Sequence, residues 1–68
     1  MKMTKAEINH QIRRNRKKFK GEDCDTLKIW LLQDIDELYT ELRSKGLNKR
    51  EKQEEFRWSG EKLKFYAS

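Results

Sequence analysis

Five apolar residues recur at intervals of three and four positions in the middle of the chain. They are Leu27, Leu31, Ile35, Leu38 and Leu42. At 100° per residue they occupy an arc of about 80° on a helix, whereas the period-two alternation of a strand would scatter them over both faces. The spacing therefore predicts an amphipathic helix over residues 27–45, at the centre of the fold.

The rest of the chain has the composition of helices rather than of sheets. Its 68 residues include no proline and three glycines, and 43% of them are charged. Lys, Glu, Leu and Arg favour helix, while residues typical of strands and turns are few. Because a chain of this length has room for one core at most, we expect a single all-α domain over residues 1–68.

A first helix is predicted over residues 5–20. Thr4 followed three positions later by Glu7 is a capping-box pattern, and Gly21 offers a left-handed C-terminal stop. Asp25 or Thr26 is expected to cap the central helix that follows. The first helix carries a thin apolar stripe made of Ile8, Ile12 and Phe19.

A third helix is predicted over residues 49–66, forming a tight hairpin with the central helix. Gly46 is expected to end the central helix in a left-handed conformation, with Leu47 packing back. Asn48 stands three residues before Glu51, which is a second capping pattern. Glycine costs about 1 kcal/mol inside a helix, so a break at Ser59-Gly60 is an alternative to a continuous third helix.

Charge is divided unevenly along the chain. Residues 1–20 carry eight basic and one acidic residue, residues 21–47 carry three and seven, and residues 48–68 carry six and four, so the segment charges of +7, −4 and +2 sum to +5. In one interpretation the first helix pairs with the carboxylates of the second, each exposed pair contributing about 0 to 1 kcal/mol. Those carboxylates are Asp34, Asp36, Glu37 and Glu41. The cations surround most of the first helix, however, so some are expected to face solvent.

Unpaired cations predict affinity for a polyanion, and nucleic acid fits this requirement. Contacts to phosphates release condensed counterions and give affinity regardless of base sequence. We therefore expect a small regulatory protein that binds DNA or RNA without strong sequence preference. The predicted contact residues are Arg13, Arg14, Arg16, Lys17, Lys18, Lys20 and, secondarily, Arg57.

The chain has more apolar residues than one small core needs. The predicted core consists of Ile8, Ile12, Phe19, Leu27, Leu31, Ile35, Leu38, Leu42, Phe56 and Leu63. The remaining apolar residues would form an exposed patch, and such patches mark protein interfaces. The predicted patch is Ile29, Trp30, Leu32, Tyr39, Trp58 and Phe65.

This patch supports an alternative function in a different class of protein. The chain would be an inhibitor or adaptor, of the kind common among bacteriophages and other mobile elements, that docks on a larger protein with an acidic groove. A homodimer through the second and third helices would also bury the patch. Burial of most of these side chains within the fold itself is the third alternative.

Several classes of protein are disfavoured. One histidine, His10, and one cysteine, Cys24, do not make a metal site, and we expect no cofactor. The chain lacks a Gly-rich phosphate loop and any pattern that pairs a nucleophile with a base, so we expect no enzyme. The longest apolar run, residues 29–32, is far shorter than the ~20 residues of a membrane span, and the lone cysteine suits a reducing cytoplasm.

Overall fold

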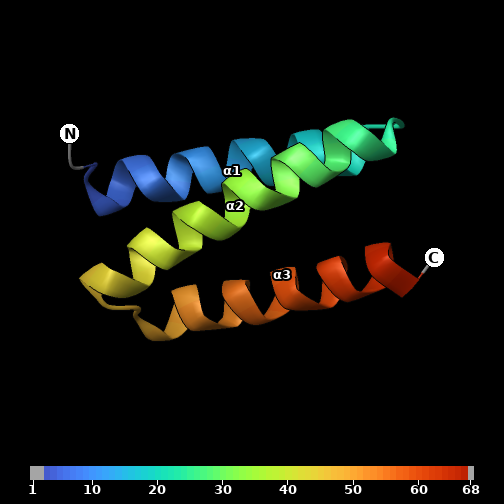
Figure 1. The fold of residues 1–68 in the computed structure, drawn as a ribbon. Coiled ribbons are helices and arrows are strands. Elements are labelled where there is room, and N and C mark those ends of the chain that lie inside the picture. Colours follow the sequence, from blue (N-terminus) through green and yellow to red (C-terminus); the bar gives the residue numbers. More distant parts are fainter. Residues whose placement is uncertain (1–2, 68) are drawn as a thin grey trace.

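A computed structural model describes residues 3–67, and this range forms three α-helices (Figure 1). They are α1 (Lys5–Gly21), α2 (Asp25–Lys45) and α3 (Lys49–Ala67). The chain runs out along α1, returns along α2 and runs out again along α3, so that α1 and α3 point the same way (Figure 1). The predicted all-α, three-helix fold is confirmed.

The start of α1 follows its predicted cap, whereas the connection to α2 does not. The Thr4 hydroxyl accepts a hydrogen bond from the backbone N–H of Glu7 at 3.2 Å. Gly21 lies inside α1 and does not have the left-handed φ predicted for it. The residue before α2 is Cys24, with no side-chain cap. The Glu22 carboxylate instead accepts from the backbone N–H groups of Asp23 and Cys24, so it satisfies the loop locally.

The turn between α2 and α3 matches its prediction at Leu47 and at the Asn48–Glu51 cap, whereas Gly46 combines the predicted positive φ with an extended ψ of 127°. Gly46 has a φ of 94° and donates its N–H to the Arg43 carbonyl at 3.0 Å, while Leu47 packs against the core. Asn48 and Glu51 cap each other: the Asn48 side chain accepts from the Glu51 N–H at 2.8 Å, and the Glu51 carboxylate accepts from the Asn48 N–H at 2.9 Å. This reciprocal cap explains why α3 begins at Lys49.

Two glycines have opposite conformational roles, and alanine substitutions test them. Gly60 lies inside α3, which continues through it without a break, and an added Cβ would meet open space. Gly60→Ala is expected to raise the free energy of unfolding by about 0.5 to 1 kcal/mol in a chemical denaturation curve. Gly46→Ala is expected to lower it by about 1 kcal/mol, because positive φ disfavours a Cβ. A destabilised Gly60→Ala variant would argue against a continuous α3.

The core lies mainly between α1 and α2, which make the closest backbone approach. Its members are Ile8, Ile12, Phe19, Leu32, Ile35, Leu38, Tyr39, Leu42 and Trp58. Three residues predicted for the core are exposed instead: Leu27, Phe56 and Leu63, the last two by 81% and 69%. Leu31 is partly buried. The predicted inner stripe of α3 therefore faces outward, because Trp58 occupies the inner position.

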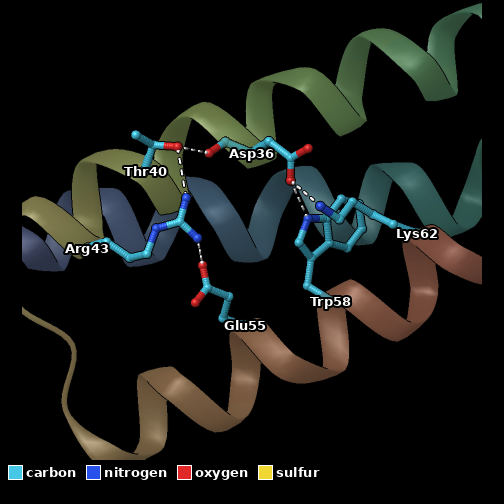
Figure 2. A network of polar contacts seen from close by, with 6 residues as sticks. All are labelled: Asp36, Thr40, Arg43, Glu55, Trp58 and Lys62. Carbon is cyan, nitrogen blue, oxygen red and sulfur yellow. Dashed lines mark hydrogen bonds and ion pairs between the residues drawn. The ribbon is translucent and has the colours of Figure 1, made fainter.

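Trp58 attaches α3 to the other two helices. Its side chain is 1% exposed, and its ring meets that of Phe19 edge-on at a centroid distance of 5.2 Å. The indole N–H donates to Asp36 at 3.0 Å, and the Lys62 ammonium donates to the same oxygen at 3.0 Å. Figure 2 shows this junction beside a second one, in which Arg43 contacts Thr40 and Glu55. One large ring and several polar contacts thus hold α3 in place.

The ion pairs of α1 reach α3, not α2 as predicted. Lys5 contacts Glu51 at 2.8 Å, and Arg16 contacts both Glu54 at 3.0 Å and Glu61 at 2.9 Å. Among the described residues, no ion pair joins α1 to α2. The reason is that α1 and α2 pack through apolar side chains, whereas the inner face of α3 presents carboxylates to α1.

Candidate nucleic-acid interface

The solvent-facing side of α1 is a continuous basic surface. Arg13, Arg14, Lys17 and Lys18 are exposed and form no ion pair with any residue in the range 3–67. Glu7, in the first turn, is the one acidic residue of α1, and the 14 residues between Glu7 and Glu22 include no acidic side chain. We call these four residues the α1 basic face.

Lys20 and Lys18 mark the two margins of this surface. The Lys20 ammonium is exposed and lies 3.6 Å from Glu61, at the edge next to α3. Lys18 borders a hollow that also includes Glu22 and Asp34, so the field on that side is weaker. We therefore expect the strongest positive potential at Arg14 and Lys17, which lie between these margins.

Arg16 is not available to a phosphate, contrary to prediction. Its side chain is 14% exposed and is held by Glu54 and Glu61, and its guanidinium lies 5.9 Å from the centroid of the Trp58 ring. Burial, the largest single influence, lowers the pKa of Arg16, but the contacts with Glu61, Tyr39 and Glu54 together outweigh it and the pKa is raised. Arg16 therefore stays charged and joins α1 to α3.

A groove between α1 and α3 brings further cations near the α1 basic face. It is a cavity of about 410 Å³ lined by Arg13 of α1 and by Arg50, Glu51 and Glu54 of α3. Those carboxylates would repel a phosphate that entered the groove. Arg13 and Arg50 are nevertheless exposed, so both helices that form the groove present positive charge to solvent.

Arg57, predicted as a secondary contact, is exposed on α3. One of its nitrogens lies 3.6 Å from Glu54, and Arg16 holds the other oxygen of that carboxylate. Glu54 is thus shared between two guanidinium groups. Arg57 places positive charge on the α3 side of the α1 basic face.

The predicted apolar patch does not form as a unit. Leu32, Tyr39 and Trp58 belong to the core, so their predicted exposure is wrong. Burial raises the pKa of Tyr39 and keeps its hydroxyl neutral. Phe65 is partly buried, and its ring centroid lies 5.6 Å from that of Phe19. Of the six predicted residues, Ile29 and Trp30 are the two that remain exposed, at the beginning of α2.

The side chains that most often bind metal ions are dispersed over the described residues. Within residues 3–67, no group of three or more His, Cys, Asp or Glu side chains is placed to hold a metal ion. Cys24 is an exposed free thiol. In the same range no helix is long and apolar enough to cross a membrane.

Comparison with known proteins adds no relative. No family model, curated protein or solved structure matches the chain. The functional argument therefore depends on charge, exposure and contacts in this molecule alone.

Proposed function

We propose that this protein binds nucleic acid without strong sequence preference, mainly through phosphate contacts from the α1 basic face. The observation that carries the proposal is the exposure of Arg13, Arg14, Lys17 and Lys18 without carboxylate partners among the described residues. Cations already held in ion pairs gain little from a phosphate. Unpaired cations attract a polyanion and release its condensed counterions on contact.

The distribution of negative charge favours approach from one side. Asp34 and Glu37 are exposed on α2, and Glu41 is partly exposed, and none of the three forms an ion pair within residues 3–67. The molecule is therefore polarised between a basic α1 and an acidic outer face of α2. A polyanion would be steered to α1 and repelled from α2.

The test is a titration by fluorescence anisotropy with a labelled 20-base-pair duplex in about 50 mM salt. Replacing both Arg14 and Lys17 with alanine is expected to weaken binding about tenfold or more. A matched variant adds Glu37→Gln and Glu41→Gln, which restores the net charge to +5 (5 − 2 + 2). We expect no recovery of affinity, because the restored charge lies on the wrong helix. Absence of binding by the unaltered protein both to this duplex and to a single strand of equal length would refute the proposal.

Binding to a larger protein is the second candidate function, and the exposed apolar side chains of early α2 favour it. Trp30 is 67% exposed, with Leu27 and Ile29 nearby in sequence and also exposed. Tryptophan is a frequent energetic anchor in interfaces. If this candidate is correct, one stoichiometric partner survives nuclease treatment in a pull-down and is lost with Trp30→Ala. Retained material that disappears with nuclease treatment supports nucleic-acid binding instead.

A further inference from the structure

The most unusual surface feature outside α1 is a phenylalanine ring set among cations. Phe56 is 81% exposed and lines a shallow hollow on the outer side of α3 with Lys49, Lys52, Gln53 and Arg57. Each charged residue that lines this hollow is basic. Large exposed aromatic rings are costly in water unless a partner covers them. Here the partner must also carry negative charge, because the ring is surrounded by cations.

The charges restrict what can cover Phe56. If two copies met through this face, Lys49, Lys52 and Arg57 of one copy would face the same three residues of the other. Like-charge repulsion therefore opposes a dimer through α3. Double-stranded nucleic acid would satisfy the cations but keeps its bases stacked inside the duplex. A single strand offers both a phosphate backbone and unstacked bases that lie on aromatic rings.

The hollow also connects to the α1 basic face. Arg57 belongs to the hollow and shares Glu54 with Arg16 of α1. Arg50, about two turns before Arg57 on α3, lines the groove together with Arg13 of α1. Basic side chains therefore continue from α1 over the groove to Phe56, a path that a flexible strand can follow.

We propose that the preferred ligand is single-stranded nucleic acid, with one base stacked on Phe56 and flanking phosphates held by Lys49, Lys52 and Arg57. This inference rests on the proposed function and specifies its ligand. Base-aromatic stacking is tolerant of base identity, so the proposal keeps binding largely independent of sequence. In this arrangement the α1 basic face binds phosphates further along the same strand.

The experiment compares three variants on a labelled 20-nucleotide oligothymidylate and on a duplex of equal length. Phe56→Leu keeps an apolar side chain but removes the ring, Phe56→Trp keeps a ring, and Leu63→Ala changes another exposed apolar residue of α3. We expect Phe56→Leu to weaken single-strand binding roughly tenfold and to leave duplex binding unchanged. The Phe56→Trp and Leu63→Ala variants should bind the single strand like the unaltered protein. Circular dichroism checks that each variant is folded.

The possible outcomes separate this inference from the function on which it rests. If the unaltered protein binds neither oligonucleotide, the proposed function fails and the inference fails with it. If it binds both and Phe56→Leu binds the single strand normally, the stacking proposal alone is overturned. If Phe56→Leu weakens both ligands equally, the ring does not read unstacked bases and the preference for a single strand is likewise overturned.

Discussion

Replacing Trp58 with alanine is expected to unfold most of the protein at 25 °C. The side chain is 1% exposed and is the single α3 member of the buried core cluster. Truncating a buried tryptophan typically costs about 3 to 5 kcal/mol, and a chain of this size has about 3 to 5 kcal/mol of stability in total. The loss also leaves Asp36 without the indole N–H. The substitution therefore removes approximately all of the available stability.

The matched control is Trp30→Ala, which truncates the same residue type at a site that is 67% exposed. We expect its thermal unfolding midpoint to stay within a few degrees of the unaltered protein, because exposed substitutions usually change stability by less than about 0.5 kcal/mol. Far-ultraviolet circular dichroism during heating measures both variants. A cooperative transition for Trp58→Ala near that of Trp30→Ala would contradict the inward placement of Trp58.

Stability is also expected to fall in acid through Glu51. Its carboxylate accepts hydrogen bonds from the Asn48 N–H, the Asn9 amide at 2.8 Å and the Lys5 ammonium at 2.8 Å. These contacts, with the Asn48 backbone bond the largest, lower the pKa of Glu51 from 4.5 to about 2. Lys5 also donates to the Gly46 carbonyl at 2.9 Å. The carboxylate thus joins α1, the α2–α3 turn and α3.

The pH range follows from the direction of this pKa change. A carboxyl whose pKa is lower in the folded state stabilises the fold above its unfolded pKa, so the contribution is complete above about pH 5 and is lost as the pH falls toward 2. With allowance for solvent screening, its size at neutral pH is about 1 to 3 kcal/mol. Glu51→Gln should therefore be less stable by about that amount at pH 7, with the difference shrinking toward zero near pH 2.

Denaturant unfolding at several pH values measures this difference. Glu55→Gln is the control, because Glu55 lies on the same helix and pairs with Arg43, which is largely exposed. Such a pair contributes about 0 to 1 kcal/mol, so this variant should follow the unaltered protein at every pH. If the gap between Glu51→Gln and the unaltered protein did not depend on pH, the three contacts would not act on the ionised carboxylate.

The positions of the helices could be predicted from sequence because local chemistry determines them. Thr4 and the Asn48–Glu51 pair begin α1 and α3 through contacts within four residues, and Gly46 ends α2 through its own backbone conformation. The predicted start of α2 at Leu27 is two residues later than the observed start at Asp25. The backbone N–H groups of the loop before α2 donate to the Glu22 carboxylate. This contact depends on the path of the loop and not on a capping pattern.

The inward face of α3 could not be predicted from apolar spacing alone. Two stripes compete on this helix, and the one with Phe56 and Leu63 looks more regular than the one with Trp58. Charge held the missing signal: at 100° per residue the four glutamates of α3 lie within an arc of about 120° centred on Trp58. A basic α1 attracts that face, so Trp58 turns inward and Phe56 outward. Because this face of α3 packs inward, Arg16 is held in ion pairs with it and is not free to contact a phosphate. For the same reason Phe56, the ring proposed to stack on a base, is exposed.

The salt dependence of nucleic-acid binding tests the central claim most directly. If Arg13, Arg14, Lys17 and Lys18 each contact a phosphate of a duplex, log affinity should fall against log salt with a slope of about −3 to −4. Replacing Arg14 and Lys17 with alanine should make that slope shallower by about 2. A slope near zero, or a slope that the substitutions leave unchanged, would show that the α1 basic face does not hold the phosphates.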